Sequence, residues 1–253
     1  MNGEVSELCA LTACAREALK GGARFEYHMG KYVNSERFVF IRQNCTEIIE
    51  ASAGQWFERL KQSGLNDIIM LLPRTDRKLH GFINSSGGCI VCFFNSGSVT
   101  YFTSKWYFDN EKKHWDIEFF ESEWENAPDK TPFFPDNTAA LGTALSDIAE
   151  LADKIEESGW ADIFRQARDI LDGGQKCELG YEDRFLNIRG IPDRNRRIYC
   201  AAAKADVFGA MGSWNDSPAW CAHEKGLSEE YDRLSAKLFF EILRALLFAV
   251  NSI

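Results

Sequence analysis

The sequence predicts an α+β protein: an N-terminal antiparallel β-meander with flanking helices, followed by a C-terminal helical bundle. Short apolar runs joined by turn residues crowd into residues 66–121, a pattern typical of antiparallel strands. Three of the six prolines fall within residues 125–137, where neither a helix nor a sheet can continue. Beyond them, apolar residues recur at helical spacing. We therefore expect a sheet domain at residues 1–130 and a helical domain at residues 131–253, packed together as one unit.

The predicted sheet domain begins with a helix. Apolar residues recur every three or four positions over residues 4–20, and two glycines then supply a stop. A strand is expected at residues 37–43, RFVFIRQ. A second helix should follow it, because Thr46 can act as an N-cap and a wide apolar face begins at Ile48 and continues until Gly64.

Four or five strands are expected next. The apolar runs are, in order, DIIMLLP, KLHGFIN, CIVCFFN, SVTYFTSKWYFD and HWDIEFFE. Residues with good turn chemistry separate them, as at 84–88 and 95–97. The gaps are too short for crossover helices, so consecutive strands should pair antiparallel.

Four longer helices are predicted in the C-terminal half, with an irregular segment at residues 175–192. They run from Asp136 or Asn137 to Gly159, from Trp160 to Gly173, from Asp193 to about Phe208, and from Ser228 to about Asn251. The last one carries two adjoining apolar stripes, so it should lie at the centre of the bundle. At about 1.5 Å per residue it is long enough to reach the sheet.

Composition limits the classes of partner. The net charge of −9 disfavours nucleic acid and anionic membranes. No apolar run reaches the roughly 20 residues that span a bilayer, and the first residues do not resemble an export signal. We expect a cytoplasmic protein without a membrane partner, and its oligomeric state is left open.

The eight cysteines are irregularly spaced, and we expect free buried thiols in place of disulfides. Cys89 and Cys92 have C-x-x-C spacing but lie in a predicted strand, where positions three apart point to opposite faces. They are therefore expected to be structural thiols, not a redox or zinc pair. We predict no metal site and no cofactor.

Residues 208–226 form the most unusual segment, FGAMGSWNDSPAWCAHEKG. Its candidate ligand-binding or partner-binding residues are Ser213, Trp214, Asn215, Asp216 and His223. The alternative is a structured connection between helices in which Trp214 lies in the core. Nucleophilic catalysis by Cys221 or Ser213 with His223 is a weaker hypothesis, because no catalytic motif accompanies them.

A basic island occupies residues 184–197 of this acidic chain. Guanidinium groups suit carboxylate or phosphate ligands, and the island precedes a predicted helix N-terminus. The candidate anion-binding residues are Arg189, Arg194, Arg196 and Arg197. The alternative is internal ion pairing.

The run WDIEFFESEWE is acidic on one face and apolar on the other. Glu118, Glu121 and Trp124 are its candidate partner-binding residues. With no catalytic motif in the chain, we expect a non-catalytic protein-binding module of the bacterial immunity type, which meets a basic protein partner. The alternatives are a scaffold subunit, or an enzyme or small anionic-ligand binder with its site near residues 209–223 and the arginine island.

Overall fold

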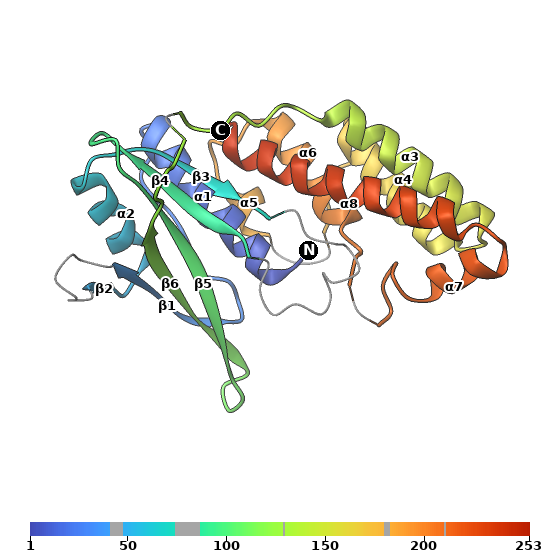
Figure 1. The fold of residues 1–253 in the computed structure, drawn as a ribbon, viewed down its shortest axis with the longest axis horizontal. Coiled ribbons are helices and arrows are strands. Elements are labelled where there is room, and N and C mark those ends of the chain that lie inside the picture. Colours follow the sequence, from blue (N-terminus) through green and yellow to red (C-terminus); the bar gives the residue numbers. More distant parts are fainter. Residues whose placement is uncertain (41–47, 74–86, 129, 180–182, 210) are drawn as a thin grey trace.

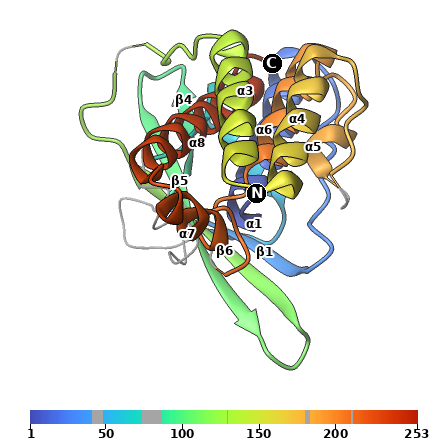
Figure 2. The same ribbon diagram turned by 90° about the vertical axis from the view of Figure 1, so that its right-hand side faces the viewer.

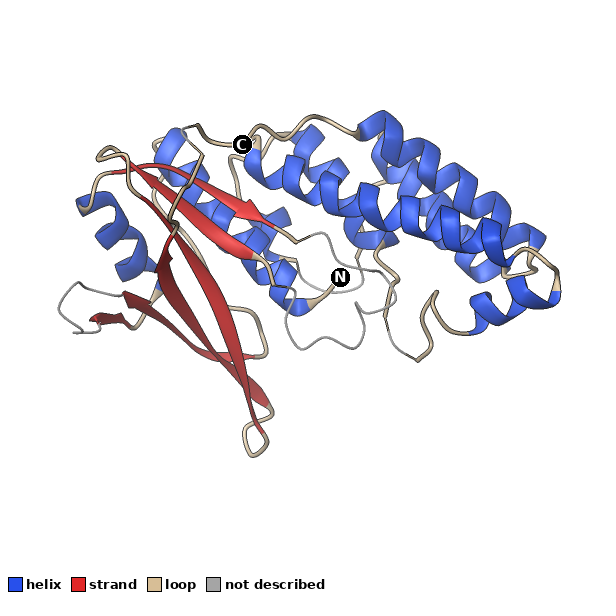
Figure 3. Ribbon diagram, viewed as in Figure 1, coloured by secondary structure: helices blue, strands red, loops and turns tan. Residues whose placement is uncertain are grey.

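The strands gather at one end of the molecule and the long C-terminal helices at the other (Figures 1 and 3). The structure, a computed structural model, describes residues 1–40, 48–73, 87–128, 130–179, 183–209 and 211–253. Among them lie six strands in one sheet and eight helices, so the α+β prediction is confirmed at that level. No helix in these ranges is long and apolar enough to cross a membrane.

The sheet is mixed, with strand order β2-β1-β6-β5-β4-β3. The strands are β1 (Val33–Phe40), β2 (Ile48–Glu50), β3 (Leu65–Leu71), β4 (Cys89–Phe94), β5 (Val99–Asp109) and β6 (His114–Glu123). From β3 to β6, consecutive strands pair antiparallel as the short turns predict. The run KLHGFIN, at residues 78–84, lies outside the described residues.

The prediction of a purely antiparallel meander is wrong at β1. This strand lies parallel to β6, from Val33 beside Trp115 to Val39 beside Phe120. Turn residues specify hairpins between neighbours in sequence, but they carry no information on where a strand from a distant part of the chain adds to the sheet. A mixed sheet follows from that long-range pairing.

Two helices accompany the sheet. The helix α1 (Gly3–Lys20) begins at Asn2, whose Oδ1 accepts a hydrogen bond from the Glu4 amide at 2.8 Å. It is buried on most sides because it lies between the sheet and the helical half, in contact with β3, β4, α5 and α8. The helix α2 (Ala53–Gln62) is capped by Ser52, so the predicted start at Thr46 is wrong. The apolar residues at 48 and 49 belong to strand β2 instead.

Four long helices pack in a ring of contacts in the C-terminal half, where α3 meets α4 and α8, and α6 meets α4 and α8 (Figure 2). The helices of this half are α3 (Thr138–Lys154), α4 (Ser158–Asp172), α5 (Arg184–Asn187), α6 (Asp193–Ala205), α7 (Ser217–Glu224) and α8 (Ser228–Asn251). The short α5 and α7 lie where the sequence predicted irregular segments, and Gly159 lies inside α4 instead of ending α3.

The helix α8 joins the two halves. Its apolar residues are buried along both predicted stripes, except Leu243, which is half-buried. Near its end, Asn251 donates to the Met70 carbonyl and accepts from the Met70 amide, both at 2.8 Å. An amide side chain that bonds both backbone groups of one β3 residue fixes the helix against the sheet, so the predicted reach of this helix is confirmed.

The sheet has two different faces. One belongs to the main core, which continues through α1 into the C-terminal helices. The other carries a small separate cluster of Ile69, Val91 and Phe93. Cys92 lies in the main core and Cys89 packs against the small cluster, so the prediction that these thiols face opposite sides is confirmed. The assignment of two domains, at 1–130 and 131–253, stays a prediction.

Candidate functional site

A cavity of about 650 Å³ lies where the second half of α1, the segment after it and the region of α5 meet. Its charged lining residues are Glu17, Arg24, Glu26, Lys31, Arg184 and Arg189. Among the described lining residues, four cations stand against two carboxylates, which makes this a basic cavity in a chain whose net charge is −9. Pockets of this volume are typical of small-molecule sites.

Arg184 forms the inner wall of this cavity. Its Nη1 donates to Glu7 Oε1 at 2.6 Å and to the Tyr27 hydroxyl oxygen at 3.0 Å. The Glu7 side chain is only 1% exposed, and its burial strengthens the ion pair. Within the described residues, Nε and Nη2 of Arg184 make no hydrogen bond, so two of the three guanidinium nitrogens remain for a ligand.

A second carboxyl group lies behind this pair. Glu36 Oε1 is 2.6 Å from the hydroxyl oxygen of Tyr27, which also contacts Glu7. Burial, followed by the Glu7 charge, raises the pKa of Glu36 to about 8. Glu36 is therefore protonated at neutral pH. The cluster then contains the Arg184 cation, the Glu7 carboxylate and two neutral groups, Glu36 and Tyr27. Without that proton, two buried carboxylates would face one arginine.

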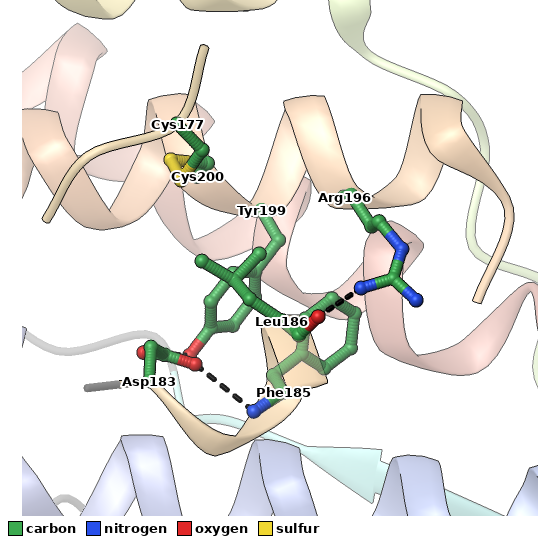
Figure 4. Close-up of a disulfide and its surroundings, with 7 residues drawn as sticks. All are labelled: Cys177, Asp183, Phe185, Leu186, Arg196, Tyr199 and Cys200. Carbon is green, nitrogen blue, oxygen red and sulfur yellow. Dashed lines mark hydrogen bonds between the residues drawn. A yellow bond between two sulfur atoms is a disulfide. The ribbon is translucent and has the colours of Figure 1, made fainter. Parts of the chain in front are cut away.

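The one-turn helix α5 carries Arg184, and α6 holds it in place (Figure 4). Asp183 caps α5 by accepting from the Phe185 amide at 3.0 Å, and it also accepts from the Tyr199 hydroxyl at 2.9 Å. The Phe185 ring stacks on Tyr199 with centroids 4.0 Å apart. Arg196 donates to the carbonyl of Leu186, at the other end of the turn. These contacts fix the direction from which Arg184 approaches α1.

A disulfide between Cys177 and Cys200 ties the segment before α5 to α6 (Figure 4). The expectation that every cysteine is a free thiol is therefore wrong at this pair. The irregular spacing of the cysteines gave no sign of it, because the two residues are 23 positions apart and meet only through the fold. Disulfides are typical of oxidising compartments, so this bond and the predicted cytoplasmic location point in different directions.

The rim of the cavity is more accessible. Arg24, Lys31 and Arg189 are exposed and form no ion pair within the described residues. Glu17 lies against Gly190, where a Cβ atom would collide with its carboxylate. The absent side chain lets the end of α1 approach the segment after α5, and this closes one side of the cavity.

The five candidate residues of the segment 208–226 lie elsewhere, and none of them lines this cavity. Trp214 is fully buried, and its Nε1 donates to Ser235 Oγ at 2.8 Å. Ser213 donates to the Gly209 carbonyl at 2.9 Å, and the half-buried Asn215 contacts the same carbonyl. Asp216 accepts from the Gly212 amide at 2.9 Å, and His223 is exposed beside Trp220.

The arginine island divides into separate roles. Arg189 lines the basic cavity. Arg196 donates to the carbonyl of Leu186 in α5 and to that of Ile188 just after it. Arg194 pairs with Asp136, and Arg197 lies 3.5 Å from Asp193. The structure thus brings Arg184 and Arg189 together at one cavity.

The acidic strand residues are distributed along β6 and just beyond it. Glu118 pairs with Arg37 at 3.9 Å and lies opposite Lys105 in the sheet. Glu121 lies opposite Phe102. Trp124 lines a second cavity on the sheet.

Sequence reasoning missed the buried cluster of Glu7, Tyr27 and Glu36. The available signal was Glu7, which stands directly before Leu8 near the start of α1. That signal is weak, because charged residues are ordinary on an amphipathic helix and only the fold shows that this one is covered.

Comparisons with protein-family models, with curated proteins and with solved structures found no match. Within the described residues, no group of three or more His, Cys, Asp or Glu side chains is placed to hold a metal ion. Any functional inference therefore depends on the geometry of the chain itself.

Proposed function

We propose that this protein binds a small anionic ligand, a carboxylate or a phosphate, in the basic cavity between α1 and α5. The observation that carries the proposal is the Arg184 guanidinium, which one buried carboxylate and one hydroxyl hold at a single nitrogen. The other two nitrogens are left to a ligand. A guanidinium that is already oriented loses little entropy when it binds a planar or tetrahedral anion.

The rim supports the same ligand class. Arg24, Lys31 and Arg189 line the cavity and form no ion pair with any described carboxylate, and they would attract an anion into the cavity. Glu17 and Glu26 would accept hydrogen bonds from hydroxyl or amine groups on the same molecule. These features favour a polar anion that also carries hydrogen-bond donors over a bare inorganic ion.

The test is calorimetric titration with inorganic phosphate and citrate at low ionic strength. We expect heat of binding for at least one of them, and an affinity about tenfold weaker in Arg189→Gln. A matched control is Arg165→Gln, which removes an exposed cation from α4 that pairs with Asp153. The proposal fails if neither anion binds, or if Arg189→Gln and the control behave alike.

Protein binding is a second candidate, favoured by the β5–β6 hairpin. This hairpin projects from the body of the molecule (Figure 1), with Tyr107 49% exposed and Phe108 43% exposed near its tip. Exposed aromatic side chains are typical of protein-binding surfaces. The hairpin also includes Glu118, one of the residues for which the sequence predicted a basic, immunity-type partner.

A pull-down from the native host, followed by salt titration of any complex, tests this candidate. A basic partner should be released as salt screens the contact, and Tyr107→Ser with Phe108→Ser should abolish capture. Capture that persists in this double variant would argue against the hairpin as the binding surface.

A further inference from the structure

The small apolar face of the sheet contains a cavity of its own, of about 480 Å³. Strands β3 and β4 form its floor with Leu71, Cys89 and Val91. Leu71 is paired with Cys89 across the two strands, and Val91 is paired with Tyr101 of β5. The backbone pairing of β3, β4 and β5 therefore fixes the positions of the floor residues and of Tyr101 beside them.

Trp124 is the second aromatic residue of the lining. It directly follows β6, and its backbone amide donates to the Val99 carbonyl at 3.0 Å, which continues the β5–β6 pairing by one residue. Trp124 and Tyr101 both pack against the apolar cluster of this face. The described lining thus combines an apolar floor on β3 and β4 with two aromatic side chains, both from the β5–β6 side of the sheet.

Among the described residues that line this cavity, the charges are all negative. Glu123 and Glu125 flank Trp124 in sequence and complete this lining, and no described basic side chain belongs to it. Both glutamates are exposed, and within the described residues neither forms an ion pair. Two carboxylates next to an apolar floor disfavour anions and attract cations.

We infer that this cavity binds a small organic cation, an alkylammonium group with an apolar body. Indole and phenol rings attract such cations through their faces, with tryptophan the strongest, and the two carboxylates add a longer-range attraction. The aliphatic floor would contact the apolar body of the ligand. A strongly hydrated inorganic ion gains little here, since the lining offers few oxygen ligands.

This inference does not depend on the proposed anion site. The described linings of the two cavities share no residue, and one of these linings includes four cations where the other includes none. A failure at one of them leaves the other untouched.

The experiment is titration with choline and benzyltrimethylammonium, followed by tryptophan fluorescence and calorimetry. The neutral tert-butyl analogue of choline serves as the comparison, because it has nearly the same shape without the charge. We expect the charged probes to bind about tenfold or more tightly than the neutral analogue. Equal binding of the charged and neutral probes would overturn the inference.

Variants locate the site. Trp124→Leu, and Glu123→Gln combined with Glu125→Gln, should each weaken benzyltrimethylammonium binding about tenfold. Glu150→Gln is the matched control, since it removes an exposed carboxylate from α3, outside the cavity lining, and should leave affinity unchanged. Thermal melts establish that every variant is folded, and unchanged binding in the folded Trp124→Leu protein contradicts the site.

A lysine side chain of a polypeptide offers the same ammonium chemistry. An oligolysine peptide is therefore titrated in parallel with the small probes. Binding of the small cations, competed by one another, supports the inference. Binding of the peptide alone overturns it in favour of a protein partner.

Discussion

The cavity at α5 and the cavity on the sheet have opposite charge and are built in different ways. In the first, Arg184 is positioned by its hydrogen bond to Glu7, by the one-turn helix α5 that carries it, and by the disulfide that ties the preceding segment to α6. The second is placed by continuous strand pairing, with its charges on exposed glutamates at the end of β6. The first should therefore respond to reduction of the disulfide and to ionisation of Glu36, whereas neither event involves a residue of the second.

The strongest test of this difference removes Arg184. In Arg184→Ala, Glu7 keeps its buried position but loses its cation, so the free energy of unfolding should fall by about 3–5 kcal/mol. Urea denaturation measures this loss. Anion binding should disappear as well, whereas binding of benzyltrimethylammonium at the sheet should persist in the folded fraction.

A surface ion pair provides the comparison that separates the loss of a buried pair from the loss of any arginine side chain. Arg194→Ala is the control, because its pair with Asp136 is on the surface and should be worth less than about 1 kcal/mol. Equal losses in the two variants would contradict the buried network.

Breaking the disulfide should have the next largest effect. Cys177→Ser should lower the free energy of unfolding by about 2–4 kcal/mol, because the unfolded chain gains freedom. It should also weaken anion binding several-fold, since the segment before α5 is no longer tied to α6. Denaturation and phosphate titration of the oxidised and reduced protein give the same comparison without mutation.

The matched control is Cys221→Ser, which alters a free, partly exposed thiol on α7. We expect a change of no more than about 0.5 kcal/mol there. If reduction weakened cation binding at the sheet as much as anion binding at α5, the structural distinction between the two cavities would be wrong.

The proton on Glu36 gives a smaller effect with a definite sign. Its folded pKa of about 8 is above the ordinary value of 4.5, so protonated Glu36 stabilises the fold at low pH. That contribution is lost as the pH rises through about 8. The groups that face Glu36 are Glu7, Tyr27 and Arg184, so its ionisation adds a second carboxylate beside one arginine.

Glu36→Gln isolates this contribution. The wild-type protein should lose about 1–3 kcal/mol of stability relative to the variant between about pH 6 and pH 8, where the unfolded chain is ionised and the folded protein is not. Its affinity for phosphate should fall relative to that of the variant as the pH rises through about 8, because the new charge opposes an anion near Arg184. Parallel stability curves for the two proteins would show that Glu36 does not carry this proton.

Local patterns predicted most helices and hairpins, but not the contacts between distant segments. Helical periodicity located α1 and α8, and turn residues located the antiparallel pairs from β3 to β6. The parallel addition of β1 to β6 had no local signal, because the two strands are joined through most of the sheet. The shift of α2 to Ser52 has a related cause, since strand pairing to β1 claims the residues at 48–50.

The same limit applies to the candidate site. The basic island was visible as a composition anomaly, and it supplied Arg184 and Arg189. Its partner Glu7 lies 177 positions away and Tyr27 lies 157 away, so no window of the sequence contains the cluster. The conspicuous Trp214 drew attention for its chemistry, but aromatic residues are as suited to a core as to a binding site.

The finest comparison uses two thiols as reporters, because each cavity contains one. Cys14 lines the basic cavity and Cys89 lines the sheet cavity, and burial raises their pKa values to about 12 and about 11. Because the two described linings differ in charge, methanethiosulfonate reagents that differ only in carrying a cation or an anion should show opposite preferences for these two thiols. We expect the anionic reagent to modify Cys14 faster and the cationic reagent to modify Cys89 faster, each by a few-fold.

Peptide mapping by mass spectrometry resolves the two sites in one sample, and Cys221 serves as an internal reference outside both cavities. Added salt should reduce both preferences together, because screening acts on attraction and repulsion alike. A shared preference at Cys14 and Cys89 would mean that the net charge of the whole chain, and not the local lining, sets the potential in these cavities. Opposite preferences would instead show that a protein with a negative net charge can contain a basic cavity. The reason would be that the buried Arg184 guanidinium, beside ionised Glu7 and protonated Glu36, is shielded from the acidic residues elsewhere in the chain.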